Sequence, residues 1–96
     1  MPSRISSGVA SYRLRIKKSA IKDLEAIPTK ADRRRIVKRI ESLAENPRPN
    51  GVQKLSGKER YRIRQGRYRI LYSIRDRELI VYIVRVDDRK SVYRNL

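Results

Sequence analysis

The stretch from residue 58 to residue 75, KERYRIRQGRYRILYSIR, constrains the fold more than any other part of the chain. On both sides of the turn Gln65-Gly66-Arg67, every second side chain is aliphatic or aromatic: Tyr61 and Ile63 before it, then Tyr68, Ile70, Tyr72 and Ile74 after it. This period of two predicts strands with one buried and one exposed face, and the glycine between them predicts a hairpin. Arg62, Arg64 and Arg69 are then expected close together on the exposed face. Their charges repel one another, so a bound polyanion is the best explanation for them.

A strand and a short helix are expected before the hairpin. Residues 12–16 alternate at period two and predict the strand, and Ser19 is predicted as the N-cap of a helix that runs to Ile27. Pro28 ends that helix. The side chains expected to face inward are Tyr12, Leu14 and Ile16 from the strand and Ile21 and Leu24 from the helix.

A longer helix is expected from about residue 29 to residue 45. Its apolar residues recur at helical spacing and predict one buried stripe, made of Ile36, Val37, Ile40, Leu43 and Ala44. Another face of this helix is basic, with Lys30, Arg33, Arg34, Arg35, Lys38 and Arg39. The spacing leaves two interpretations open for this face: a solvated surface of a very basic protein, or a surface that docks on phosphates.

The rest of the chain completes an α+β domain. Residues 46–51 contain two prolines and Asn-Gly, which predicts a loop that Val52 and Leu55 hold to the core. After a second turn at residues 75–78, the apolar run 79–84 predicts a strand covered on both faces, followed by a basic tail at 85–96. The predicted order is β-α-α-β-β-β, with two N-terminal helices packed on a small, mainly antiparallel sheet. Residues 1–11 are predicted to form a flexible arm, and residues 12–96 one domain.

Composition narrows the function. The 96 residues carry 26 Lys and Arg against 10 Asp and Glu, a net charge of +16, which favours an acidic partner such as a phosphate backbone. There is no cysteine or histidine, so disulfides, thiolate metal sites and His-based acid–base catalysis are excluded. No metal or other cofactor is expected. The longest apolar run has six residues, too few to span a membrane, and a cytoplasmic location is expected.

Four segments together resemble the RelE branch of the RelE/ParE superfamily of bacterial type II toxins: the loop NPRPNGVQKLSG, the hairpin YRIRQGRYRILYSI, the apolar strand and the closing RVDDRKSVYR. The resemblance runs from about residue 12 to the end. It implies a RelE-like fold and a small cytoplasmic toxin, neutralised by an acidic, RelB-like antitoxin in a hetero-oligomer. RelE-like members enter the A site of the 70S ribosome and cut the mRNA there. They use the RNA's own 2′-hydroxyl and no metal.

By position, the resemblance implies a catalytic set of Arg62, Arg64, Arg69, Arg89 and Tyr93. Arg62 and Arg64 stand where well-studied members have two lysines, and Arg69 matches an arginine that contacts the scissile phosphate. Arg89 matches an arginine assigned to protonating the leaving group, and Tyr93 matches a tyrosine that stacks on or orients a nucleotide. Further RNA contacts are predicted for Lys54, Lys58, Arg60 and Arg67.

Two departures from the family pattern bear on the chemistry. Arginine at both lysine positions removes the groups best suited to become a neutral base, because guanidinium stays protonated below about pH 12. Asp88 lies where many relatives carry a basic residue or histidine. The resemblance therefore implies either redistributed roles or weak activity. Asp87 and Asp88 are expected to pair with nearby arginines, and Tyr61, Tyr68, Tyr72 and Tyr82 to belong to the core or its rim.

Three functions stay open at this point. The first is a ribosome-dependent mRNA endonuclease, which the arginine cluster on the hairpin favours. The second, on the same fold, is a ParE-like inhibitor of DNA gyrase that acts by binding protein. The third is an RNA- or ribosome-binding module without catalysis, which the missing lysines keep possible.

Overall fold

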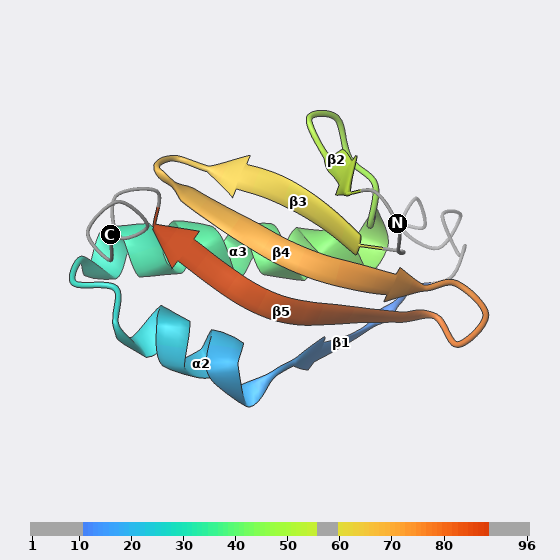
Figure 1. The fold of residues 1–96 in the computed structure, drawn as a ribbon, viewed down its shortest axis with the longest axis horizontal. Coiled ribbons are helices and arrows are strands. Elements are labelled where there is room, and N and C mark those ends of the chain that lie inside the picture. The colour runs from blue at the N-terminus through green and yellow to red at the C-terminus, as the bar shows by residue number, and fades with distance from the viewer. Residues whose placement is uncertain (1–10, 56–59, 89–96) are drawn as a thin grey trace, which may run out of the picture.

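The computed structural model describes residues 11–55 and 60–88, and Figure 1 shows them as a twisted sheet with one long helix behind it. The elements are β1 (Arg13–Ile16), α2 (Lys18–Glu25), α3 (Lys30–Glu45), β2 (Gln53–Leu55), β3 (Arg60–Gln65), β4 (Tyr68–Arg75) and β5 (Ile80–Asp88). The five strands lie in the order β1-β5-β4-β3-β2; β1 is parallel to β5, and the other neighbours are antiparallel. The predicted class and element order are confirmed, with β2 as an addition. The predicted arm lies almost wholly outside the described residues.

The core lies between α3 and the sheet. The predicted stripe of α3 is confirmed: Ile36, Ile40 and Leu43 are buried, and Val37 and Ala44 are half-buried. The sheet supplies the facing layer by alternation, interrupted once by a bulge in β5, with Tyr61, Ile63, Tyr68, Ile70, Tyr72, Ile74, Val81, Ile83 and Val86 buried. Each fully buried side chain of this size contributes roughly 1.5–3 kcal/mol. Because every second residue points into this layer, the arginines between them lie on the other face.

The first helix differs from its prediction because its contacts are with β5. Lys17, not Ser19, is the N-cap of α2, and the helix ends at Glu25. The Ser19 hydroxyl instead donates to the carbonyl of Val84, 3.1 Å away, at a bulge where β5 has one residue more than β4. Ile21, which was expected to be buried, is 42% exposed, and Ala20 is the buried residue of the helix instead.

Beyond the end of β1, a side chain replaces that strand as the hydrogen-bond partner of β5. The Asp23 carboxylate of α2 accepts a hydrogen bond of 2.9 Å from the Val86 N–H. Backbone groups at a strand edge need such partners, so Asp23 holds α2 beside the second half of β5. Ile16, the last residue of β1, is 37% exposed instead of inward-facing, because the sheet edge leaves it partly uncovered.

The last strand begins and ends later than predicted. Leu79 lies in the turn with φ +56° and is 38% exposed, and β5 runs from Ile80 to Asp88. Val81 and Ile83 are fully buried, whereas Tyr82 and Val84 are only half-buried. The prediction of a strand covered on both faces is therefore fully confirmed only for the face toward α3. The face away from α3 is only partly covered.

A set of polar contacts holds the loop after α3, and we call its residues Tyr12, Pro47, Arg48, Tyr72 and Asp76 the latch. The Tyr72 hydroxyl donates to the Pro47 carbonyl at 2.6 Å. Arg48 donates to both carboxylate oxygens of Asp76 at 3.2 and 2.9 Å, and the Tyr12 hydroxyl donates to Asp76 at 2.8 Å. Val52 packs against the core as expected, and the next residues form β2 instead of an irregular loop. The latch thus joins the loop to the turn between β4 and β5.

Candidate nucleic-acid interface

The hairpin of β3 and β4 positions the predicted arginines. Gln65 pairs with Tyr68 across a turn of Gly66 and Arg67, and Gly66 has φ +63°, a conformation that glycine adopts without strain. Arg64 lies directly opposite Arg69 in the register. Side chains that face each other across antiparallel strands have Cβ atoms roughly 4.5–5.5 Å apart. The hairpin therefore places the two side chains next to each other on the face away from the core, with Arg64 exposed and Arg69 half-buried.

Arg62 is held in place by the strand that the sequence did not predict. Gln53 of β2 lies opposite Arg62 in the register, and its Oε1 accepts a hydrogen bond of 2.7 Å from Arg62 Nη2. Arg62 is half-buried, so its head group has a defined position beside Arg64 on the same strand. Gln53 is the site residue that sequence reasoning missed.

Among the described residues of the predicted catalytic set, Arg69 is the one with a buried hydrogen-bond donor that has no acceptor. Its side chain is half-buried, and its Nε is buried with no hydrogen-bond partner in the described part of the chain. Asp87 lies opposite Arg69 in the register with β5, but its carboxylate is 3.2 Å from Arg85. An unsatisfied buried donor costs about 1–3 kcal/mol, and a like-charged neighbour adds to that cost. A bound anion would remove both penalties.

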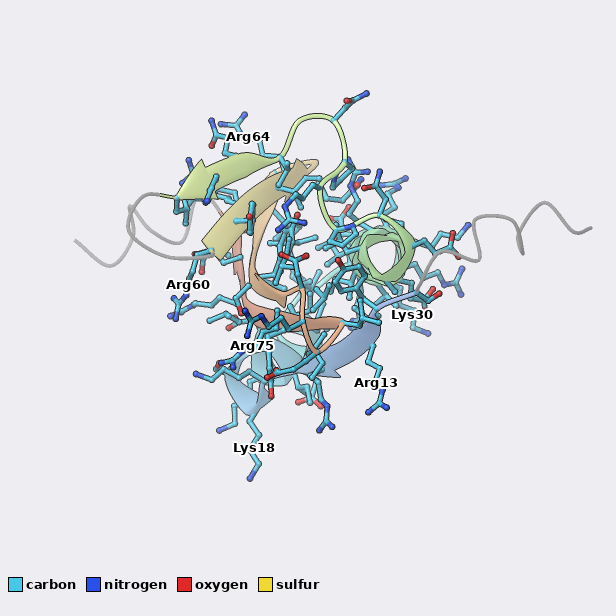
Figure 2. All side chains as sticks on the ribbon, turned by 90° about the vertical axis from the view of Figure 1, so that its right-hand side faces the viewer. Arg13, Lys18, Lys30, Arg60, Arg64 and Arg75 are labelled. Atoms are coloured by element: carbon cyan, nitrogen blue, oxygen red, sulfur yellow. The ribbon has the colours of Figure 1, made fainter. Side chains whose placement is uncertain are left out.

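The other predicted RNA contacts lie in different places. Arg60 is exposed at the start of β3, on the same face as Arg62. Figure 2 shows Arg60 and Arg75 projecting on one side of the sheet, with α3 on the other. Lys54 is in register with the buried Tyr61, so its side chain starts from the opposite face to Gln53. Lys58, Arg89 and Tyr93 lie outside the described residues.

Two acidic residues pair with arginines, as expected. Asp88 accepts a hydrogen bond of 2.9 Å from Arg67, whose guanidinium also lies 5.7 Å from the ring centre of Tyr68. This hydrogen bond raises the pKa of Arg67. Asp87 pairs with Arg85. The two carboxylates are therefore engaged with separate arginines.

Three of the described tyrosines, Tyr12, Tyr68 and Tyr72, have a raised pKa and are therefore poorly suited to act as a base at neutral pH. The pKa of Tyr12 is raised, chiefly by its hydrogen bond to Asp76. Burial raises the pKa of Tyr68 and of Tyr72. Tyr61, Tyr68 and Tyr72 are buried and Tyr82 is half-buried, which confirms their predicted place in the core or rim. The described arginine cluster therefore has the charge to bind a phosphate, but Tyr12, Tyr68 and Tyr72 do not supply a base beside it.

No group of three or more potential metal-ligating side chains occurs within residues 11–55 and 60–88. None of the helices in the same ranges is long and apolar enough to cross a membrane.

Comparison with known proteins gives this arrangement its context. The family model described as the ParE toxin of the type II toxin–antitoxin system, parDE, matches residues 14–93. The putative toxin RelE1 of Methanocaldococcus jannaschii is 28% identical over 88 residues, which cover 88% of this chain and 97% of that protein.

Solved structures agree with the family match. A chain of the RelE–RelB complex of Pyrococcus horikoshii OT3 is 33% identical with a TM-score of 0.74, over 82% of this chain and 96% of that one. A chain of the RelBE2 toxin–antitoxin complex of Mycobacterium tuberculosis is 29% identical with a TM-score of 0.71, over 82% of this chain and 99% of that one. The chain belongs to the RelE/ParE superfamily and is a RelE-like toxin of a type II toxin–antitoxin system.

Proposed function

We propose that this toxin is a ribosome-dependent mRNA endonuclease that cuts in the A site and so inhibits translation. The observation that carries the proposal is the pair Arg64 and Arg69, two guanidinium groups in register on one face, with Arg69 Nε buried and unpartnered among the described residues. Such a pair fits a phosphodiester group, since guanidinium binds phosphate through two charge-assisted hydrogen bonds.

Cleavage would proceed by attack of the RNA's own 2′-oxygen on the adjacent phosphorus. The 2′-hydroxyl loses its proton, the bond from phosphorus to the 5′-oxygen breaks, and that oxygen receives a proton. The products are a 2′,3′-cyclic phosphate and a 5′-hydroxyl end. Arg64 and Arg69 would stabilise the extra negative charge on the pentacoordinate phosphorus, a contribution of the kind that preorganised donors make in many enzymes. Arg62, fixed by Gln53, would position the neighbouring phosphate.

The two proton transfers are assigned by resemblance. Arg89 would protonate the leaving oxygen, and Tyr93 would orient a nucleotide or, with its pKa lowered by surrounding cations, accept the 2′ proton. Lys54, Lys58, Arg60 and Arg67 would contact the RNA more widely. In this proposal the chemistry rests mainly on electrostatics and on positioning by the ribosome, in the cytoplasm and without a metal.

A cognate antitoxin is the proposed protein partner. Two of the similar structures are RelE–RelB and RelBE2 complexes, and the net charge of +16 favours an acidic chain. The toxin would be held inactive in a hetero-oligomer with a RelB-like antitoxin that covers part of its basic surface.

A second candidate is inhibition of DNA gyrase by binding, because the matching family model is that of the ParE toxins. A non-catalytic RNA- or ribosome-binding module is a third, supported by arginine at both lysine positions. Both alternatives predict intact mRNA.

Primer extension on a short mRNA translated by purified components separates these functions. Wild-type protein is expected to produce new 5′ ends inside codons only when ribosomes are present, and Arg69→Ala to abolish them. Arg77→Ala, at an exposed arginine in the turn after β4, is the matched control and should cut as the wild type does. Intact mRNA at saturating wild-type protein would refute the proposal and direct attention to gyrase and to binding without cleavage.

A further inference from the structure

The outer face of α3 carries a row of cations that the proposed cleavage does not use. Lys30, Arg34 and Lys38 recur every four residues, so they share one side of the helix. All three are exposed, and within the described residues none of their side chains has a hydrogen bond or ion pair. They span about 12 Å of helix axis. We call Lys30, Arg34 and Lys38 the α3 ridge.

The ridge lies on the other side of the molecule from the hairpin arginines. Figure 2 views α3 nearly end-on, with Lys30 beside it and with Arg60 and Arg75 projecting from the far side of the sheet. The core of the protein, including Ile36 and Ile40 of α3 itself, lies between these two surfaces. An RNA segment bound at the hairpin therefore leaves the ridge free for another contact.

The charges of α3 run against the preferences of the helix. The positive end of a helix dipole is at its N-terminus, where acidic side chains are favoured and cations are not. Here Lys30 and Arg33 lie in the first turn with Asp32 as the acid, while the last turn has no basic residue and ends at Glu45. Like charges four residues apart also repel one another. Since helix stability disfavours the ridge, a bound anion is the better explanation for it.

The surroundings of the ridge favour a phosphate backbone over bases or protein. Together with Arg33, Arg35 and Val37, the ridge lines a shallow hollow of about 700 Å³, and among its described lining residues there is no carboxylate or aromatic ring. Unpaired bases are usually held by aromatic stacking, whereas double-helical RNA is recognised by its shape and phosphates. Protein interfaces are usually anchored by aromatic side chains as well as by arginine; the hollow has no aromatic side chain, and the exposed large hydrophobics of the described residues are Ile16, Ile21 and Leu79, none of them on α3.

We propose that the α3 ridge binds the phosphate backbone of double-helical RNA, as a second RNA surface opposite the hairpin. Its assignment to ribosomal RNA rests on the proposed function, because a toxin that cuts mRNA on the ribosome has to be held there while the hairpin engages the mRNA. The ridge then supplies affinity for the ribosome and takes no part in the chemistry.

The test replaces the ridge without weakening the helix. The variant Lys30→Gln, Arg34→Gln, Lys38→Gln keeps good helix formers and removes repulsion, so its melting temperature should equal or exceed that of the wild type. The control Lys17→Gln, Lys18→Gln, Lys22→Gln makes the same change of charge at exposed residues in and just before α2. Binding of a short RNA duplex is measured by fluorescence anisotropy over a range of salt concentrations.

The expected result is specific to the ridge. The plot of log affinity against log salt concentration should become shallower by about 2–3 for the ridge variant, from the loss of three phosphate contacts. The control should keep the wild-type slope. An equal change in both variants would overturn the proposal in favour of a general effect of net charge. Polyglutamate of matched charge is measured in the same way. If it binds the wild type as tightly as the RNA duplex does, and loses as much affinity in the ridge variant, the assignment to RNA is overturned in favour of an acidic protein.

The two proposals can fail separately. If the wild type cuts mRNA and the ridge variant binds the duplex as tightly as the wild type does, the ridge proposal alone is refuted. If the wild type does not cut mRNA on ribosomes, the proposed function is refuted, while the duplex measurement still decides whether the ridge binds RNA.

Discussion

The hairpin and α3 both present rows of basic side chains, but the fold holds them differently. On the hairpin, Arg62 is fixed by Gln53 and Arg69 is half-buried with its Nε enclosed. On α3, the ridge side chains are exposed and have no partner in the described part of the chain. Fixed donors suit the stabilisation of one transition state, whereas mobile cations suit contact with a long phosphate backbone. The hairpin surface, where Arg62 and Arg69 are held although Arg64 is exposed, is therefore assigned to catalysis, and the exposed ridge is assigned to binding.

The largest expected effect lies at the pair Arg64 and Arg69. Changing either to alanine should lower the maximal cleavage rate by about 10²–10³, as removal of one preorganised donor does elsewhere. Because both would contact the same phosphate, the double variant should lose less than the sum of the two single losses. Rates are measured at saturating ribosomes, with Arg77→Ala, at an exposed arginine in the turn after β4, as the control. Fully additive losses would show that the two side chains act independently, against the pairing proposed for them.

A smaller effect is expected at Gln53, which tests whether a fixed position matters. Gln53→Ala frees Arg62 and should lower the cleavage rate about tenfold, the equivalent of one hydrogen bond to a charged group. The effect should vanish when Arg62 is already alanine, since Gln53 acts through it. A loss of equal size in the Arg62→Ala background would mean that Gln53 has another role.

Arg48 contrasts with Arg69, because its guanidinium already has a carboxylate partner within the protein. Its hydrogen bonds to Asp76, followed by that of Tyr12, hold the pKa of Asp76 below its usual 3.8. A lowered pKa means that Asp76 stabilises the fold above about pH 4 and that this contribution is lost as the pH falls through the lowered value. Denaturant unfolding between neutral and acid pH should show wild type more stable than Asp76→Asn at neutral pH, with the difference shrinking in acid. A difference independent of pH would contradict this.

The smallest effect is expected on the stability of α3. The ridge variant with three glutamines should be more stable than the wild type by about 0.5–1 kcal/mol, from relief of two like-charge pairs and of the conflict with the helix dipole. Denaturant unfolding at low salt measures this, and high salt should reduce the gain. A variant less stable than the wild type would show that the ridge supports the fold.

The sequence predicts those parts of the fold that local pattern determines. The alternation around Gly66 predicts the hairpin, and the stripe on α3 predicts its buried face; both are confirmed. Local pattern also places Arg62, Arg64 and Arg69 on one face.

The features that the sequence does not predict depend on contacts between residues far apart in the chain or on the geometry of a turn. Gln53 follows a proline-containing loop without alternation, and its strand forms only because β3 lies beside it. Ser19 has the sequence of an N-cap but donates to Val84 across the fold. Leu79 belongs by composition to an apolar run, yet the chain turns there with positive φ. In each case a tertiary contact or turn outweighs local propensity.

The most direct test is a titration of mRNA cleavage against ribosome concentration for wild type, Arg69→Ala and the ridge variant. The division between catalysis and binding predicts that Arg69→Ala lowers the maximal rate at an unchanged half-saturating concentration. The ridge variant should raise the half-saturating concentration and keep the maximal rate. If both variants lower the maximal rate alike, or if neither changes cleavage, the division of work between the two surfaces is wrong.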